Sequence, residues 1–330
     1  MRDWRQVLSI CLLGYSLVLA SRLVAQCAPK PCPAGFDCAA PSEIVSLAVS
    51  GKGEWVATFV ADGAVVLWDV KSGHRDRLFT CHKNVNALAF SPDSQTLVLG
   101  DAVGTIEFLA IPSGNSSQRR IQDRDEIGDL RFSPDGRRLA SLHDKGITVW
   151  EVVGHRELIF VPVSKISAYA FSHDGSRLAV AAEDGKVTIW DITSNKRIKI
   201  FDLAAGDWSN ALTFDHTDQR LVSGNGHNSI VVWDVETREK LKVMKGHADQ
   251  VLYLTFLPDG LTLISEADDG SVRTWDFNTG RLMQTWKMPA GRLSENGQLF
   301  VTVDMGRIDC WDFANKQKIR TLEYKSPRAS

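Results

Sequence analysis

A short β-branched segment that ends in Trp, or once in Leu, recurs seven times along the chain, each time just after a turn. The marker residues are Trp68, Leu109, Trp150, Trp190, Trp233, Trp275 and Trp311. Successive markers lie 36 to 43 residues apart. A repeat period near 40 residues is typical of the blades of a β-propeller.

A second motif, a tight turn, lies between the markers. It reads FSPDS, FSPDG, FSHDG, FDHTD, FLPDG and LSENG, beginning at Phe90, Phe132, Phe171, Phe214, Phe256 and Leu293. Pro, Asp, Asn and Gly favour turns, so each motif predicts a hairpin between two strands. An apolar run, the marker strand and a further apolar run follow each turn. The pattern predicts an all-β fold, a seven-bladed β-propeller of four-stranded antiparallel blades.

The two motifs together resemble those of the WD-repeat family of β-propellers, over roughly residues 43–323. The resemblance implies a hydrogen-bonded set of His, Ser or Thr, Asp and Trp within a blade. Blade six has all four, as His247, Ser265, Asp269 and Trp275, and the other blades have part of the set.

Most marker residues are followed by Asp, and we expect structural roles for both positions. The Trp fills space between blades, and the Asp accepts hydrogen bonds from turn amides. These markers are Trp68, Asp69, Trp150, Trp190, Asp191, Trp233, Asp234, Trp275, Asp276, Trp311 and Asp312. Blade two departs from the pattern with Leu109 and Ala110, and blade seven has a shortened first strand around 288–293. Residues 318–324, KIRTLEY, are predicted to supply the outer strand of blade seven without a strand from the N-terminus.

The N-terminus has the order of a secretory signal peptide. Arg2 and Arg5 precede an apolar stretch over 7–20, which is short for a membrane span, and cleavage is expected after Ala25. The predicted organisation is a signal peptide over 1–25, a Pro- and Cys-rich linker over 26–42, the propeller over 43–324 and a tail over 325–330. The protein is therefore expected to be exported, to the periplasm or out of the cell. Membrane attachment is the alternative, through an uncleaved signal or through lipidation of Cys27.

Removal of the signal peptide would leave five cysteines, an odd number in an oxidising compartment. We expect one disulfide among the linker residues Cys27, Cys32 and Cys38, and unpaired thiols elsewhere. Their spacing is not that of Cys-x-x-Cys zinc or haem motifs, so no metal site and no cofactor are predicted.

Charge and motifs argue against two further classes of function. The chain has 38 basic and 40 acidic residues, a net charge of −2, and no basic patch of the kind that binds phosphate backbones, so nucleic acid is not an expected partner. It has no Gly-x-Ser-x-Gly or His-Glu-x-x-His segment, so catalysis is not expected.

One set of loops is the best candidate for binding, because equivalent loop positions in the repeats carry acids and one large aromatic. These positions are Glu43, Glu126, Lys165, Glu183, Trp208, Gln250, Asp268 and Asp304. An exposed Trp among carboxylates favours a protein or peptide partner with Arg or Lys side chains. The alternative is that the acids serve solubility and that Trp208 packs on its own loop.

The sequence thus predicts an exported, monomeric, non-catalytic protein-binding scaffold that uses the loop face around the central channel of the propeller. The alternative function is a propeller enzyme, or a small-molecule or metal-binding protein, with its site at the channel mouth.

Overall fold

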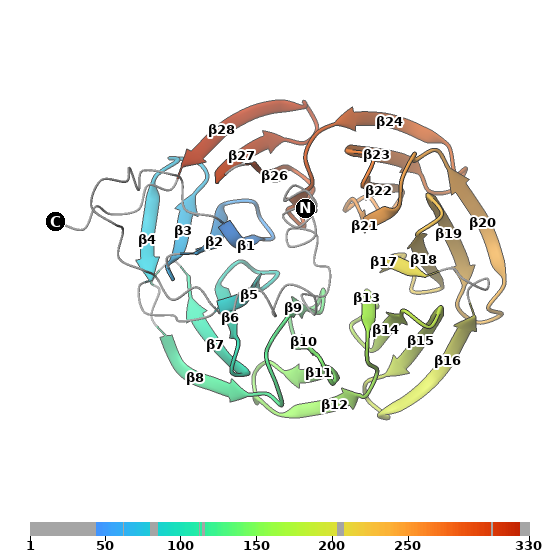
Figure 1. Ribbon diagram of the computed structural model, residues 1–330, viewed down its shortest axis with the longest axis horizontal. Helices are drawn as coiled ribbons and strands as arrows, with labels where there is room; N and C mark the ends of the chain where they lie inside the picture. The colour runs from blue at the N-terminus through green and yellow to red at the C-terminus, as the bar shows by residue number, and fades with distance from the viewer. Residues whose placement is uncertain are drawn as a thin grey trace, which may run out of the picture. The chain divides into compact units, whose positions relative to one another are not determined.

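The computed structural model describes residues 44–61, 63–79, 85–111, 113, 116–202, 208–304 and 306–323. These residues form 28 β-strands in seven four-stranded antiparallel sheets (Figure 1). The predicted fold, a seven-bladed β-propeller, is confirmed. Within the described residues, no helix has the length and apolar character needed to cross a membrane.

The blades fall into two compact units. The first holds blades one, two and seven. Its strands are β1 (Ile44–Val49), β2 (Trp55–Val60), β3 (Val65–Asp69), β4 (Arg75–Phe79), β5 (Val85–Phe90), β6 (Thr96–Asp101), β7 (Thr105–Ala110), β8 (Ser116–Gln122), β25 (Gly291–Leu293), β26 (Leu299–Asp304), β27 (Arg307–Asp312) and β28 (Gln317–Glu323).

The second unit holds blades three to six. Its strands are β9 (Asp129–Phe132), β10 (Arg138–His143), β11 (Gly146–Glu151), β12 (Glu157–Val161), β13 (Ile166–Phe171), β14 (Arg177–Ala182), β15 (Lys186–Asp191), β16 (Lys196–Asp202), β17 (Ser209–Phe214), β18 (Arg220–Asn225), β19 (Ser229–Asp234), β20 (Lys240–Lys245), β21 (Val251–Phe256), β22 (Thr262–Ala267), β23 (Ser271–Asp276) and β24 (Leu282–Lys287).

Burial differs between the strands of a blade in the way the sequence suggests. The second and third strands are apolar and mostly buried; β14, for example, is buried from Leu178 to Ala182. Hydrophobic clusters form between neighbouring sheets of a unit, such as the one that joins Phe201 of blade four to Trp233 of blade five. The outer strands β16, β20 and β24 are largely exposed. Packing between sheets therefore depends on the inner strands.

Each marker Trp lies at a β-bulge, which is not evident from the sequence. The pairing of the third and fourth strands shifts at Trp68, Trp150, Trp190, Trp233, Trp275 and Trp311, and beside Leu109 in blade two. A bulge inserts one extra residue, bends the strand and increases its twist. The extra residue lies on the outer strand, as in blade six, where Thr274 pairs with Gln284 and Trp275 with Leu282.

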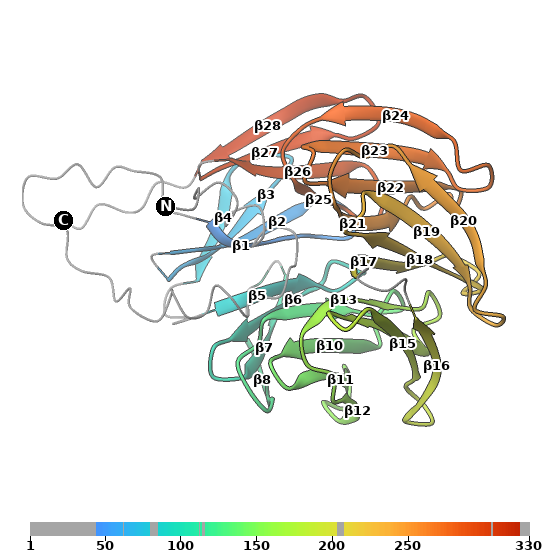
Figure 2. The same cartoon turned by 45° about the vertical axis from the view of Figure 1, so that its right-hand side comes forward.

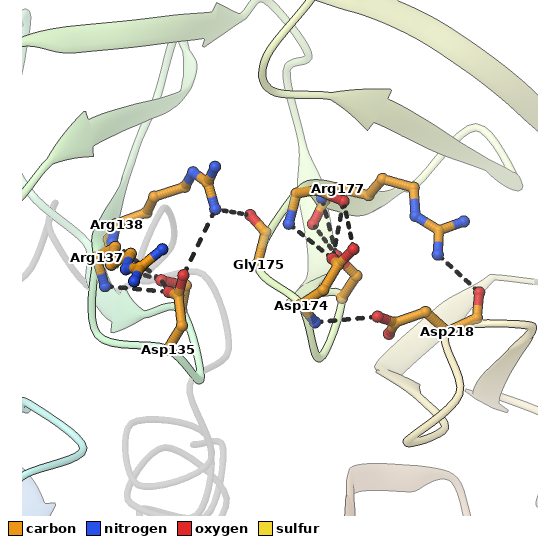
Figure 3. A network of polar contacts seen from close by, with 10 residues as sticks. Asp135, Arg137, Arg138, Asp174, Gly175, Arg177 and Asp218 are labelled. Atoms are coloured by element: carbon orange, nitrogen blue, oxygen red, sulfur yellow. Dashed lines mark hydrogen bonds and ion pairs between the residues drawn. The ribbon is translucent and has the colours of Figure 1, made fainter.

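The tight turns of blades three to five are joined by side chains that reach the next turn (Figure 3). Arg138 Nη1 donates to the Gly175 carbonyl at 2.7 Å, and Arg177 Nη2 donates to the Asp218 carbonyl at 2.8 Å. The Asp218 carboxylate accepts the amide of Asp174 at 3.0 Å. The side chains of Arg138, Arg177 and Asp218 are therefore hydrogen-bonded to backbone groups of a neighbouring turn.

Blade seven takes all four of its strands from one stretch of chain, in the order β25-β26-β27-β28. Its first strand has only three residues, and its outer strand is β28, as the sequence predicted. The Arg320 guanidinium on β28 donates to the carbonyls of Lys71 and Ser72 in blade one, at 2.9 and 3.1 Å. Among the described residues, the four strands of blade seven all come from 291–323.

Several predictions fall outside the described residues. They are the signal peptide, the linker with Cys27, Cys32 and Cys38, Glu43, and the tail over 325–330. Cys310 is described; it is a buried free cysteine on β27, and burial raises the pKa of its thiol to about 12.

Candidate functional site

Blade six contains the four-residue network expected from the sequence. His247 Nδ1 lies 3.1 Å from Asp269 Oδ2, and His247 Nε2 lies 2.7 Å from Ser265 Oγ. The Trp275 indole donates to Ser265 Oγ at 2.8 Å. A carboxylate can only accept, so Nδ1 carries the proton of the neutral histidine and donates it to Asp269, and Nε2 accepts the Ser265 hydroxyl. The four side chains form one chain of hydrogen bonds that ends at the carboxylate.

The protonation of this network is shifted by its burial. Burial lowers the pKa of His247, and the opposing effect of Asp269 does not restore it. Burial alone would raise the pKa of Asp269, but hydrogen bonds from Ser271, the Ala248 amide and His247 hold it well below its usual range. The neutral His247 and the ionised Asp269 thus connect the loop before β21, the turn after β22 and the strands β22 and β23 by hydrogen bonds, which is a structural function.

Blade three has a related network in which Asp123 takes the place of His247 and a histidine, His143, lies at the end of the second strand. The Asp123 carboxylate accepts the Ser141 hydroxyl, and it also accepts the Thr148 hydroxyl at 3.0 Å. Trp150 donates to Ser141 Oγ at 2.9 Å, and His143 Nε2 lies 3.1 Å from Thr148 Oγ1. The family pattern does not reveal this set, because blade three has Asp123 and not a histidine before its first strand.

His143 is fully enclosed in this second network. Burial lowers its pKa, and the charge of Asp123 opposes that shift. The ring stacks on Phe160 with centroids 5.8 Å apart and planes 8° apart. Its Nδ1 atom has no hydrogen-bond partner in the part of the chain that the structure describes. His143 is the last residue of β10, as Ala182 and Ala267 are of β14 and β22, so it does not occupy the loop position of the exposed Glu183 and Asp268 that repeat spacing suggested.

The marker Trp residues all use their indole N–H groups in the same way. Each donates to a Ser or Thr hydroxyl at 2.8 to 3.1 Å: Trp68 to Thr58, Trp150 to Ser141, Trp190 to Thr188, Trp233 to Ser223, Trp275 to Ser265 and Trp311 to Thr302. Blade four has Val180 where blades five and six have Ser223 and Ser265, and its Trp turns to Thr188 on its own strand.

The Asp residues after the markers accept hydrogen bonds from turn amides three residues further along. The distances are 2.6 to 2.9 Å for Asp69, Asp191, Asp234, Asp276 and Asp312. These bonds lower the pKa of Asp191, Asp234, Asp276 and Asp312. The carboxylates are thus engaged with the backbone of their own turns.

In blade six, Asp269 in the turn before the marker strand accepts a hydrogen bond from the Ser271 amide. In blades five and two a different residue accepts the turn amides, which the spacing of the sequence motifs did not reveal. Asn225 Oδ1 accepts the amides of His227 and Ser229 in blade five. Asp101 Oδ1 accepts the amides of Val103 and Thr105 in blade two. In both blades the accepting side chain lies at the end of the second strand, not in the turn that follows it.

Trp208 is the most prominent residue of the proposed binding loops. Its side chain is 41% exposed. The indole lies against Gly226, where an added Cβ would come within 2.6 Å of the ring, and its centroid is 6.2 Å from that of His227. The Gly226 amide also donates to the Trp208 carbonyl at 3.3 Å. Trp208 therefore packs on the loop after β18 and keeps part of its indole open to solvent.

Other binding-loop residues of the same unit pair within their blades. Lys165 Nζ lies 3.5 Å from a Glu183 carboxylate oxygen, and both side chains are well exposed. Gln250 Nε2 donates to Asp268 Oδ2 at 2.6 Å. Gln250 also accepts a hydrogen bond from Asn210 at 2.9 Å, which links blades five and six. The charge of Glu183 is thus balanced by Lys165, and the Asp268 carboxylate is hydrogen-bonded to Gln250.

The first unit holds the remaining predicted positions. Glu126 Oε1 accepts a hydrogen bond from Asn86 at 2.7 Å. Asp304 is exposed at the end of β26. Among the described residues, no group of three or more His, Cys, Asp or Glu side chains is arranged to hold a metal ion.

Comparison with known families identifies the repeats. The model of the WD domain, G-beta repeat, matches residues 73–102, 116–151, 154–191 and 238–276. Three of these matches end directly after a marker Trp, at residues 151, 191 and 276. The chain is a WD-repeat protein.

Curated relatives of this WD-repeat protein include subunits of larger complexes. It is 29% identical over 160 residues to "Protein LST8 homolog" of Drosophila melanogaster, covering 44% of this chain and 51% of the relative. It is 25% identical over 159 residues to "Target of rapamycin complex subunit wat1" of Schizosaccharomyces pombe, covering 45% and 51%. It is also 26% identical over 151 residues to "Telomerase protein component 1" of Mus musculus, covering 45% of this chain and 6% of the relative. The matched segment spans about half the length of the first two relatives.

Proposed function

We propose that this WD-repeat protein is an exported, non-catalytic scaffold that binds a partner protein or peptide through the loops around Trp208. The observation that carries the proposal is the placement of Trp208. An indole held against Gly226 loses little conformational freedom on binding, and its open part offers apolar surface. Aromatic residues fixed in this way are enriched among the dominant contacts of protein interfaces.

The surroundings of Trp208 favour a partner with cationic side chains. Asp249 and Asp268 are exposed near Gln250, whose own side chain is bonded to Asn210 beside Trp208. A cation can bind both the face of an indole and a nearby carboxylate. Lys165 balances Glu183 on a neighbouring blade, so we place the contact at the loops of blades five and six and not across the whole set of predicted positions.

Two further observations support the class of function. The relatives that share these repeats include a subunit of a target of rapamycin complex, so a chain with similar repeats works inside a protein assembly. The residues most typical of the repeats, including His247, Asp269 and Asp276, are engaged in structural hydrogen bonds. Neither observation requires a cofactor or a catalytic group.

Export is proposed from the N-terminal sequence alone. Its test is N-terminal sequencing of the protein recovered from its native host. A chain that begins at Gln26 in the extracytoplasmic fraction supports the proposal, and a chain that begins at Met1 in the cytoplasm contradicts it.

The binding site is tested by photo-cross-linking in living cells. A photoreactive amino acid at position 268 should cross-link a partner, whereas one at position 259, in the tight turn between β21 and β22, should not. Trp208→Ala should reduce the yield at position 268 without changing the amount of folded protein. Equal yields at both positions, or an unchanged yield in Trp208→Ala, would show that the partner binds elsewhere.

A further inference from the structure

The outer strands of the blades differ in how well charge protects their open edges. An outer strand hydrogen-bonds to its blade on one side only, so peptide groups on the other side can pair with another chain. Proteins commonly guard such an edge with charged side chains, especially Lys. Figure 2 shows β16, β20 and β24 as the last strands of three consecutive blades of the second unit.

Most of the exposed outer strands follow this rule. β16 has Lys196, Arg197 and Lys199; β20 has Lys240, Lys242 and Lys245; β28 has Lys318 and Arg320. The cation nine residues after the marker Trp also bonds to a neighbouring blade: Lys199 to the Glu236 carbonyl at 3.1 Å, and Lys242 to the Phe277 and Asn278 carbonyls at 2.8 and 2.6 Å. A cation at this position therefore connects two blades and also places charge beside the open edge of the strand.

The centre of β24 lacks this protection. It has five consecutive uncharged residues, Leu282 to Trp286, and the first four are exposed. Gln284 stands where the equivalent strands have Lys199, Lys242 and Arg320. Leu282 is 43% exposed and Met283 is 55% exposed, so apolar side chains lie next to the open edge. An exposed, uncharged and partly apolar edge strand is suited to receive another strand.

The charges at the ends of this stretch indicate which kind of strand fits. Arg281 precedes it and Lys287 ends it, and both are exposed. Lys287 Nζ is held by the Asp269 carbonyl at 2.9 Å, which fixes its position beside the edge. A second copy of β24, paired antiparallel about Gln284, would bring the Arg281 end of each strand to the Lys287 end of the other, and the bulge at Met283 would interrupt the pairing. Like charges directly opposite each other destabilise a strand pair, so a second copy is disfavoured.

We propose that the open edge of β24 binds an extended segment of another protein, with an uncharged, β-branched centre and carboxylates at both ends. The segment adds as a fifth strand to blade six. Backbone hydrogen bonds supply most of the affinity, Leu282 and Met283 contact its apolar side chains, and Arg281 and Lys287 pair with its acids. This site is on the outer strand and is independent of the loops around Trp208.

The test uses the mature full-length protein and two synthetic seven-residue probe peptides. Both have alternating valine and threonine; one has glutamate at each end and the other has lysine. Binding is measured by titration to about 1 mM peptide, a concentration that still detects weak association, with the indole NMR signal of Trp286 as a local reporter. That signal is assigned with a Trp286→Phe variant. The glutamate peptide should bind and shift it, and the lysine peptide should bind about tenfold more weakly.

Three variants locate the binding. Gln284→Lys introduces the charge that β16 and β20 have, and it should abolish binding of the glutamate peptide. Leu241→Lys adds the same charge to β20, and Trp208→Ala alters the proposed loop site; both should bind this peptide as the wild type does. Circular dichroism verifies the fold of each variant.

Four results would overturn the proposal. These are failure of both peptides to bind, equal binding of the glutamate and lysine peptides, unchanged binding in Gln284→Lys, and dimerisation of the protein that Gln284→Lys abolishes. If Trp208→Ala abolished binding, the peptide would belong to the loop site. The loop site around Trp208 is tested separately by cross-linking at position 268, so failure of the β24 site and failure of the loop site give different results.

Discussion

Replacement of Ser265 by Ala should destabilise the protein more than the loss of one small hydroxyl suggests. Ser265 is completely buried, and its oxygen serves two partners, the Trp275 indole at 2.8 Å and His247 Nε2 at 2.7 Å. Ser265→Ala leaves both polar atoms in place without this partner. An unsatisfied buried donor or acceptor costs about 1–3 kcal/mol, so we expect a loss of about 3 kcal/mol in the free energy of unfolding.

A matched variant in blade four separates this effect from a general cost of losing a hydroxyl. Thr188 accepts the Trp190 indole at 3.0 Å, so Thr188→Val leaves one indole without its partner and keeps the shape of the side chain. Thr188→Val should lower the free energy of unfolding by about 1–2 kcal/mol. Urea unfolding followed by circular dichroism measures both values, with the m-value as a check that the same surface unfolds.

A double-mutant cycle then tests whether the network acts as a unit. Trp275→Phe removes the indole donor, so the additional cost of Ser265→Ala in that background should fall by about 1 kcal/mol or more. If Ser265→Ala cost no more than Thr188→Val, or if the two blade-six substitutions were additive, the hydrogen-bonded chain would not stabilise the blade as argued.

Further predictions concern protonation, packing and thiol reactivity. Burial holds the pKa of His247 below its ordinary value of 6.5, so the unfolded chain binds the proton at a higher pH than the folded chain does. The stability that neutral His247 contributes is therefore present above about pH 6.5 and is lost as the pH falls toward the pKa of the folded state. The urea midpoint should therefore fall between pH 8 and pH 5, and less steeply in His247→Gln; equal slopes would contradict this. Gly226→Ala would place a Cβ within 2.6 Å of Trp208, so it should lower the free energy of unfolding by about 1–3 kcal/mol and reduce cross-linking at position 268. Unchanged cross-linking would show that packing on Gly226 does not position the indole. Cys310, whose pKa is raised to about 12, should react with a disulfide reagent only after unfolding, as measured by the difference from Cys310→Ser; rapid reaction in the native state would contradict its burial.

The architecture could be predicted from the sequence because its signals are local and repeated. Each marker strand and each tight turn depends on residues a few positions apart, and the period near 40 residues multiplies the signal. Blade seven illustrates this, because its short first strand β25 and its outer strand β28 were both visible in the sequence. The bulges at the marker residues were not visible, since they depend on the pairing between two strands and not on either strand alone.

The side-chain networks were harder to predict, because different residues can satisfy the same geometry. Asp123 in blade three takes the position that His247 has in blade six, and Asn225 in blade five replaces a turn aspartate. A search for fixed residue types misses such exchanges, whereas a search for any buried polar group that needs a partner would have found them.

The binding loops show the same limit. The sequence placed Lys165, Glu183, Gln250 and Asp268 in one set of loops, but it did not predict that Lys165 pairs with Glu183 or Gln250 with Asp268. It could not show that Lys165 balances the acid beside it, since that depends on side-chain conformation. The identity of the partner lies in surface chemistry that has no repeated pattern.

The central claim is that Trp208 anchors a partner protein. Its most direct test is affinity capture from the cell envelope with the wild-type protein and with Trp208→Ala, after both are shown to have the same unfolding midpoint. We predict a partner that the wild type retains and that Trp208→Ala loses. Capture of the same partners in the same amounts by both proteins would contradict the claim.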